Sequence, residues 1–252
     1  MRTIGLGWKP DLPDLRDYGF KAELQDFTTF PRRLDWYDGI TNIPACYNQL
    51  QTSSCVGNST ARVINLRELI QGEPAVPFMP SRLFLYFNAR QLEGSSGADD
   101  GARIRDCIKS AIIDGVCPEL ESPFDPAMVN AMPSDQCYTD AQKLEAISYR
   151  RVNNLSLQDI IAALNVGPIV GGISVYTSFM DSTNGIIRMP SGNDTLEGGH
   201  ALAWTAYSMD DRTFTFDNSW GPGWGMQGRG TVPFDYLTSG LADDFWLIDK
   251  LS

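Results

Sequence analysis

Apolar residues in the first half of the chain recur at the spacing of helices. The first such stretch runs from about residue 54 to a stop signal at Gly72, and Ser53 or Ser54 is placed to cap its first turn. One face of this predicted helix carries Val56, Ser59, Val63, Leu66 and Ile70. Two further stretches have the same character, SRLFLYFNARQLEG (81–94) and ARIRDCIKSAIIDG (102–115), and one short predicted helix, SLQDIIAALN (156–165), lies in the second half.

The second half is dominated by short apolar segments that turn signals separate, a pattern typical of β-strands. The predicted strands are PIVGGISV (168–175), GIIRM (185–189), HALAWTAY (200–207), RTFTFDNSW (212–220), GTVPF (230–234) and DFWLID (244–249). Helices followed by strands predict an α+β protein of two lobes, with a cleft between the lobes as the natural place for a site.

The predicted domain organisation has two parts. Residues 1–30 are rich in Pro, Asp and aromatic residues without a clear period, so we expect an extended N-terminal arm. Residues 31–252 form the main domain, with a helical lobe over about 31–135 and a β-rich lobe over about 136–252.

Composition limits the partners of the chain. The 252 residues carry a formal net charge of -11 without a block of Lys or Arg, which argues against nucleic acid and anionic lipid. No apolar stretch is long enough to span a membrane, and the N-terminus lacks the apolar region of a signal peptide. The five cysteines form no C-x-x-C pair, which argues against a zinc site and a full disulfide framework and favours a cytoplasmic or other reducing compartment. We expect neither a cofactor nor a metal.

His200 is the single histidine of the chain, so any Cys/His chemistry must use it as the base. A lone histidine at a strand end is most often structural. Here, however, the strands at 200–207 and 213–220 are predicted to pair as a hairpin, which brings Asn218 beside the imidazole. The Asn218 amide can then accept the ring N–H and fix the tautomer, and Trp220 can shield that bond from water.

Cys55 lies at the first turn of the first predicted helix, where the partial positive charge of the helix N-terminus favours a thiolate. A buried apolar role is the ordinary alternative for a cysteine, and we favour it for the other four: Cys46, Cys107, Cys117 and Cys137. Gln49, six residues before Cys55, can donate its side-chain amide to an oxyanion together with the Cys55 backbone N–H.

These residues lie in three blocks that resemble papain-like (C1 family) cysteine peptidases, in the order of that family. NQLQTSSC (48–55) is similar to the segment with the oxyanion glutamine and the nucleophile, and GGHALAWTAY (198–207) is similar to the histidine strand. DNSWGPGWGMQGRG (217–230) resembles the stretch that carries the orienting asparagine, and this block is the most specific. The resemblance covers about residues 30–250.

The resemblance implies a papain-like two-lobed fold, with a helical N-terminal lobe, an antiparallel β-barrel-like C-terminal lobe and the active site in the cleft between them. It also implies a role for each of these residues. Cys55 is the expected nucleophile, His200 the general base and acid, Asn218 the orienter and Gln49 the oxyanion donor. Gly101 is the expected partner of the substrate backbone. Gly172 and Ala201 are expected to shape an apolar pocket for the residue two before the cut, although close strand packing is an alternative for Gly172.

The chain also departs from the family pattern. Val56 follows the nucleophile, where well-known members have Trp, and Thr52 replaces a disulfide cysteine. The arm replaces a long prodomain, and it either covers the cleft or braces a lobe of its own catalytic domain; we favour bracing. The implied activity is endopeptidase action on polypeptides through an acyl-enzyme. An acyl transferase or peptide ligase that uses the same thioester, and a peptide-binding pseudoenzyme, are the alternatives.

Overall fold

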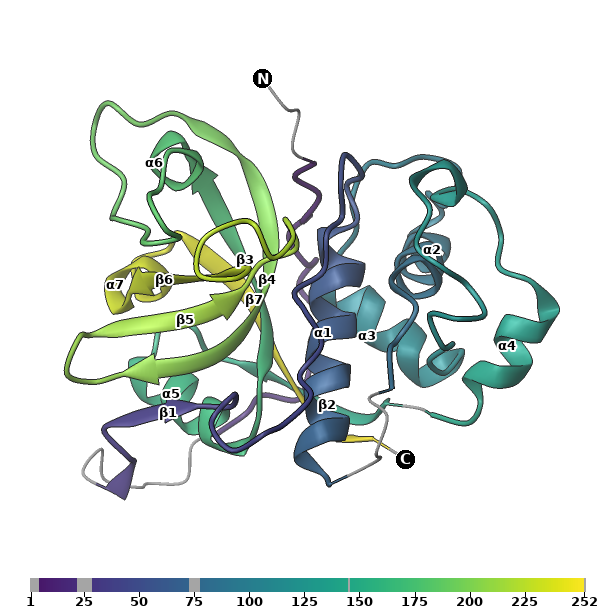
Figure 1. Ribbon diagram of the computed structural model, residues 1–252, viewed down its shortest axis with the longest axis horizontal. Coiled ribbons are helices and arrows are strands. Elements are labelled where there is room, and N and C mark those ends of the chain that lie inside the picture. The colour runs from purple at the N-terminus through teal and green to yellow at the C-terminus, as the bar shows by residue number, and fades with distance from the viewer. Residues whose placement is uncertain (1–4, 22–28, 73–77, 145, 252) are drawn as a thin grey trace.

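Helix α1 (Cys55–Ile70) runs between the two lobes of the chain, as the computed structural model in Figure 1 shows. The structure describes residues 5–21, 29–72, 78–144 and 146–251. Helices lie on one side of α1 and a sheet lies on the other side. Because both lobes pack against it, α1 is buried from Cys55 to Arg67, around its whole circumference rather than on one face.

The helical lobe is built on helices that end where the sequence indicates. Helix α2 begins after Ser81, whose side chain accepts the Phe84 N–H at 3.1 Å, and it ends at Gly94 in the left-handed conformation. The elements of this lobe beside α1 are α2 (Arg82–Glu93), α3 (Ile104–Ile113), the short 3₁₀ helix η2 (Pro126–Met128) and α4 (Asp135–Ala141).

The other lobe is formed by one open antiparallel sheet. Its strands are β1 (Arg33–Asp35), β2 (Ala146–Val152), β3 (Ile169–Tyr176), β4 (Leu196–Ser208), β5 (Thr213–Asp217), β6 (Arg229–Pro233) and β7 (Ala242–Leu251). The strand order is β2-β7-β3-β4-β5-β6, and β1 pairs with β4 outside this path. Three helices connect or flank the strands: α5 (Leu157–Val166), α6 (Thr177–Met180) and α7 (Phe234–Thr238). The predicted α+β fold with a helical and a β-rich lobe is therefore confirmed.

Two elements lie in the other lobe than the expected boundary near residue 135 assigns them to. β1 lies near the N-terminus but belongs to the sheet, and α4, which begins at Asp135, packs its Cys137 and Ala141 with Phe84 of the helical lobe. The predicted hairpin is present, with β4 and β5 antiparallel from Ser208 opposite Thr213.

The predicted strand at 185–189 is wrong. Only Ile186 forms isolated bridges, with Thr183 and Thr231, so the segment is an irregular loop. Gly185 has a φ of +72°, which turns the chain away from an extended path.

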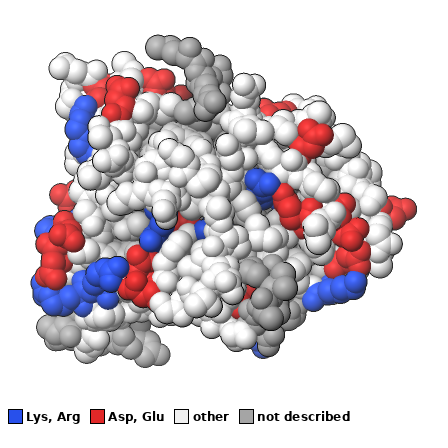
Figure 2. Space-filling view, in the orientation of Figure 1, with Lys and Arg blue, Asp and Glu red and all other residues white. Residues whose placement is uncertain are grey.

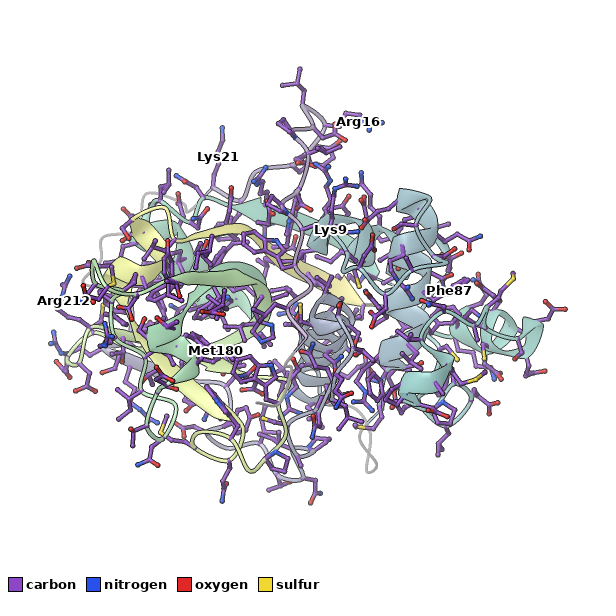
Figure 3. The ribbon with its side chains drawn as sticks, turned by 90° about the horizontal axis from the view of Figure 1, so that it is seen from above. Lys9, Arg16, Lys21, Phe87, Met180 and Arg212 are labelled. Atoms are coloured by element: carbon purple, nitrogen blue, oxygen red, sulfur yellow. The ribbon has the colours of Figure 1, made fainter. Side chains whose placement is uncertain are left out.

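The arm contacts both lobes along its described residues. Figure 1 shows its purple trace passing between the sheet and the helical lobe. Further along, Phe20 enters the core of the sheet lobe, and its N–H donates to the Arg151 carbonyl at 2.6 Å. In the view of Figure 3, Lys9 lies between Phe87 of the helical lobe and Met180 of the sheet lobe, whereas Arg16 projects away from the body of the protein.

Charged side chains of both signs are mixed on the face shown in Figure 2, and uncharged residues fill much of its centre. On this face the acidic side chains therefore do not form one continuous patch. Within the described ranges, no helix is long and apolar enough to cross a membrane.

We predict that Trp204→Ala lowers the free energy of unfolding by about 3–5 kcal/mol, because it leaves a cavity in the sheet lobe. Trp204 is fully buried, with its ring centroid 5.4 Å from that of Phe216 and 5.6 Å from that of Phe245. Urea denaturation followed by circular dichroism measures the change. Leu155→Ala, at a side chain 65% exposed, is the control and should change stability by less than about 0.5 kcal/mol. Equal effects of the two substitutions would contradict this account of the core.

Candidate active site

The single histidine of the chain is held on one side by an amide. The hairpin of β4 and β5 brings the Nε2 of His200 to 2.8 Å from the Oδ1 of Asn218. The same oxygen accepts the Ser219 N–H at 2.8 Å, so it is an acceptor, and the Nε2 of His200 must carry the proton. The Trp220 ring stacks on the imidazole with 5.1 Å between the centroids. The Nδ1 is left unprotonated, and it has no hydrogen-bond partner among the described residues.

Cys55 is the first residue of α1 and is fully buried. Burial raises the pKa of its thiol to about 11, and backbone hydrogen bonds from Ala201, Gly7 and Val56 only partly oppose the rise. Because Ala201 follows His200 in β4, its hydrogen bond to the sulfur places the thiol beside the histidine strand. Strand β4 and helix α1 thus bring together the two groups that the sequence indicated.

The protonation of this pair differs from the expected thiolate. Burial lowers the pKa of His200 to about 4, against the hydrogen bond to Asn218, while the pKa of Cys55 is raised. At pH 7 the stable form in this arrangement therefore has a neutral Cys55 thiol and a neutral His200 imidazole. The helix N-terminus and the backbone donors favour the thiolate, but removal of the sulfur from water has the larger effect.

The predicted cap of α1 is also wrong. Ser54 occupies the N-cap position, but its ψ is 22° and its side chain makes no capping hydrogen bond. A capping serine needs extended dihedrals to reach the helix N–H groups. Instead, the Ser54 Oγ lies 2.6 Å from the Thr52 Oγ1 and accepts the Asn58 amide at 2.9 Å, while the Ser53 N–H donates to the Asp99 carboxylate.

Gln49 is buried beside the start of α1, and its amide bonds both to the arm and to the asparagine loop. Its Nε2 donates to the Gly5 carbonyl at 2.9 Å and to the Thr52 carbonyl at 2.7 Å. Its Oε1 accepts the Ser219 hydroxyl at 2.5 Å, and its backbone N–H donates to the Ser219 carbonyl at 2.8 Å. Ser219 therefore links Gln49 to Asn218, a role that sequence reasoning missed although the residue lies within the Asn-Ser-Trp motif.

The arm runs through the cleft at the level of these residues. The Gly7 carbonyl accepts the Ala102 N–H at 2.9 Å, and the Lys9 N–H donates to the Ala102 carbonyl at 3.0 Å, which is parallel strand pairing. Ala102, rather than Gly101, is the residue whose backbone pairs with the arm. Gly101 has a φ of +90° and faces the arm directly, since a Cβ on it would lie 2.2 Å from the Gly7 carbonyl oxygen.

The indole of Trp8 fills the space above the small residues of the sheet. A Cβ on Gly172 would lie 2.2 Å from the Trp8 ring, and one on Gly199 would lie 2.6 Å from the Trp8 carbonyl. The Trp8 N–H donates to the Gly199 carbonyl at 3.1 Å, and the Trp8 Nε1 donates to the Asp244 Oδ2 at 3.1 Å. Gly172 therefore accommodates a large aromatic side chain of the arm.

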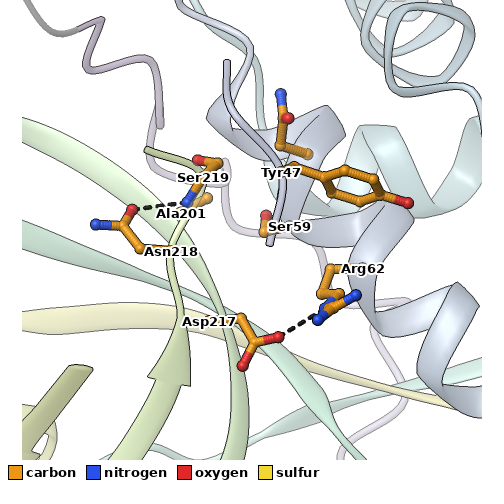
Figure 4. Close-up of a pocket in the computed structure, with 8 residues that line it drawn as sticks. Tyr47, Ser59, Arg62, Ala201, Asp217, Asn218 and Ser219 are labelled. Atoms are coloured by element: carbon orange, nitrogen blue, oxygen red, sulfur yellow. Dashed lines mark hydrogen bonds and ion pairs between the residues drawn. The ribbon is translucent and has the colours of Figure 1, made fainter. Parts of the chain in front are cut away.

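A small cavity lies behind the site at the boundary of the lobes (Figure 4). Among its polar groups, the Tyr47 hydroxyl and the Asn218 Nδ2 have no hydrogen-bond partner in the described part of the chain. Residues from both lobes line this cavity: Tyr47, Asn58, Ser59, Arg62, Ala201, Asp217, Asn218 and Ser219.

The five cysteines, all within the described ranges, are free and buried. Over the same ranges, no group of three or more His, Cys, Asp and Glu side chains is arranged to hold a metal ion.

Comparisons with known proteins agree with this geometry. A family profile described as papain family cysteine protease matches residues 30–234. The crystal structure of xylellain, a cysteine protease from Xylella fastidiosa, superposes with a TM-score of 0.89 at 37% identity and covers 99% of this chain and 97% of that chain. A peptidase C1-like protein of Acanthamoeba polyphaga mimivirus, itself uncharacterized, is 32% identical over 98% of this chain and 87% of its own length.

More distant structures share the fold alone. A cysteine protease from Carica candamarcensis superposes with a TM-score of 0.67 at 18% identity, over 87% of this chain and 99% of that chain. The long profile match and the two relatives above 30% identity identify the family. The chain belongs to the papain family of cysteine proteases, cysteine-type peptidases that act on polypeptides.

Proposed function

We propose that the chain is a cysteine endopeptidase in which Cys55 is the nucleophile and His200 the general base and acid. The observation that carries this proposal is the bond between the His200 Nε2 and the Asn218 Oδ1, because it leaves the Nδ1 free to take the thiol proton. The Cys55 sulfur then attacks a peptide carbonyl carbon and forms a thioester as the amine leaves with a proton from His200. Water, deprotonated by His200, hydrolyses the thioester and regenerates the thiol.

Gln49 is the proposed donor to the oxyanion of the tetrahedral intermediate. Its side chain is buried and held by Ser219, so it need not reorganise when negative charge develops on the substrate oxygen. Its Nε2 already donates to a carbonyl oxygen of the arm, that of Gly5, which is the kind of acceptor a substrate provides.

The arm is the proposed inhibitor of its own cleft, in place of the bracing role that we favoured from the sequence. Gly5 bonds to the oxyanion donor, Gly7 hydrogen-bonds the Cys55 sulfur, and Trp8 lies over Gly172. A substrate needs each of these positions. Displacement of the arm exposes the sulfur to water, which removes the cause of its raised pKa and makes the thiolate accessible at neutral pH.

Substitutions at the four proposed catalytic residues should lower peptide hydrolysis to different degrees. Cys55→Ala and His200→Ala should abolish turnover, Asn218→Ala should leave a slow enzyme, and Gln49→Ala should lower kcat by about 10²- to 10³-fold. Hydrolysis of a fluorogenic peptide, with circular dichroism as the folding control, measures the effects. Full activity of the folded Cys55→Ala chain would contradict the proposed function.

Trp8→Ala should raise kcat/KM of the full-length chain by about tenfold or more, because it raises the population of chains whose cleft is open. The fluorogenic peptide assay measures the gain. Leu15→Ala is the matched control in the same arm, because the Leu15 side chain is fully exposed, and it should leave kcat/KM unchanged. Equal activity of the two variants would contradict inhibition by the arm.

Two carboxyl groups meet where the arm leaves the cleft. The Asp11 N–H donates to the Asp244 Oδ2 at 2.7 Å, and the Asp11 Oδ2 accepts the Trp246 Nε1–H at 2.8 Å. Burial and, to a smaller extent, the charge of Asp244 raise the pKa of Asp11 to about 7. Arg105 acts in the opposite direction.

Asp244 is affected in the same direction as Asp11. Burial raises its pKa, and the neighbouring Asp243 adds to the rise, whereas Arg151 opposes it with an ion pair at 3.0 Å. For Asp11, which belongs to the arm, the raised pKa means that protonation of the carboxyl group stabilises the docked arm. Because the docked pKa exceeds the ordinary value of about 4, this stabilisation is complete below pH 4 and is lost as the pH rises to about 7.

Asp11→Asn should remove this pH dependence, because an amide resembles the protonated carboxyl group at every pH. We expect the native chain and the variant to hydrolyse peptide at equal rates near pH 4.5, and the native chain to be several-fold faster near pH 7.5. The ratio of the two rates cancels the titration of Cys55 and His200, which both proteins share. A ratio that is constant with pH would exclude Asp11 as the titrating group.

A further inference from the structure

A buried ion pair joins the nucleophile helix to the strand that precedes the asparagine. Arg62 lies two turns after Cys55 on α1, and Asp217 is the last residue of β5, directly before Asn218. The Arg62 Nε donates to the Asp217 Oδ2 at 2.6 Å, and the two side chains are 3% and 2% exposed. Figure 4 shows this pair crossing from the helix to the end of the strand, and both residues line the small cavity behind the site.

Further polar groups fix the position of the Asp217 carboxylate. The Tyr37 hydroxyl donates to its Oδ2 at 2.5 Å, and the Arg229 Nε lies 3.3 Å from its Oδ1. Arg229 in turn pairs with Asp35 at 2.8 Å, so the cluster contains two cations and two carboxylates. Both oxygens of Asp217 have hydrogen-bond donors, since Arg62 and Tyr37 donate to Oδ2 and the Thr205 hydroxyl donates to Oδ1 at 3.3 Å.

We infer that the Arg62–Asp217 ion pair is a positioning device for the active site, setting Asn218, and through it His200, relative to the helix that begins at Cys55. This inference rests on the proposed function of these residues. Arg62 and Asp217 touch no reacting atom and act through their neighbours. The reacting pair is divided between the lobes, because Cys55 is in α1 and His200 is in β4, so the separation of the two elements must be fixed by contacts across the boundary.

The chemistry of a buried ion pair favours positioning over stability. Removing two charges from water offsets most of their attraction, so an apolar pair of similar volume often stabilises a fold as well or better. An ion pair also fixes the relative orientation of the two elements that carry it, because a guanidinium and a carboxylate meet in few geometries. Here that orientation is imposed one residue before Asn218, whose own N–H is held by the Gly228 carbonyl at 2.8 Å.

Because His200 is the single histidine, ¹⁵N-histidine labelling of the full-length chain reports the site with one imidazole signal set. In the native chain we expect an Nε2–H signal that exchanges slowly with water, since this proton is buried and bonded to Asn218. Asp217→Asn should broaden or shift this signal and speed its exchange. It should also lower kcat by about 10- to 100-fold while KM stays within about twofold.

Arg67→Lys is the matched control. Arg67 is a buried arginine on the same helix and also reaches the sheet lobe, donating to the Val166 carbonyl at 2.7 Å and to the Asp249 carbonyl, but it lies farther along α1 from Cys55. Its substitution should lower the midpoint of unfolding and leave both the His200 signal and kcat unchanged. It therefore separates a general loss of stability from a loss of positioning.

Tyr37→Phe covers the case in which Asp217→Asn does not fold. It removes one hydrogen bond to Asp217 without changing the charge, and it should shift the His200 signal in the same direction by a smaller amount. The inference is overturned if folded Asp217→Asn, or Tyr37→Phe in its place, keeps the native Nε2–H signal. Since the signal is read without substrate, a chain that fails to hydrolyse peptides even with Trp8→Ala to open the cleft would refute the proposed function and leave this test intact.

Discussion

Helix α1 imposes a constraint that the rest of the site must meet, because its arginines are buried between two lobes with little water to balance their charge. Arg62 meets this constraint with Asp217, and Arg67 meets it with backbone carbonyl groups. The first solution ties the helix to the residue before Asn218. In the proposed mechanism, this one buried contact sets the position of Cys55 relative to the His200 imidazole, although the two residues come from different lobes.

Whereas the ion pair holds the reacting groups in position, the N-terminal arm keeps these groups from a substrate in the proposed function. Its Gly5 carbonyl accepts a hydrogen bond from the Gln49 amide, and its backbone pairs with that of Ala102. The Cys55 sulfur is buried as well. The groups that would act on a substrate are therefore occupied by the chain itself. Burial raises the pKa of the Cys55 thiol and lowers the pKa of the His200 imidazole. Farther along, the arm is held by carboxylates, at Asp244 and through Asp17, which pairs with Arg105 at 2.8 Å. Docking of the arm and the protonation of buried acids are therefore linked.

Much of the fold could be predicted from the sequence, because long elements carry their own signals. The helix at Cys55 and the hairpin of β4 and β5 follow from periodicity and turn residues, and a single histidine left no choice of base. The strand expected at 185–189 failed because a short apolar run contains no information about its pairing partner. The cap at Ser54 failed because the Ser54 hydroxyl bonds to Thr52 and Asn58 instead of to the helix N–H groups.

The remaining features depend on contacts between residues far apart in the chain. The pairing of Ala102 with the arm, the link from Ser219 to Gln49 and the contact of Arg62 with Asp217 all require the lobes to be assembled. Asp217 lies inside the most specific motif of the chain, but its role is apparent only when its partner on α1 is known.

The intact mass of the full-length chain after treatment with a peptidyl epoxysuccinate, measured beside that of Cys55→Ala, tests most directly the central claim that Cys55 is the nucleophile. The account predicts a single adduct on the native chain and none on the Cys55→Ala variant. If both the native chain and the Trp8→Ala variant, whose cleft is opened, stayed unmodified, the account would be contradicted.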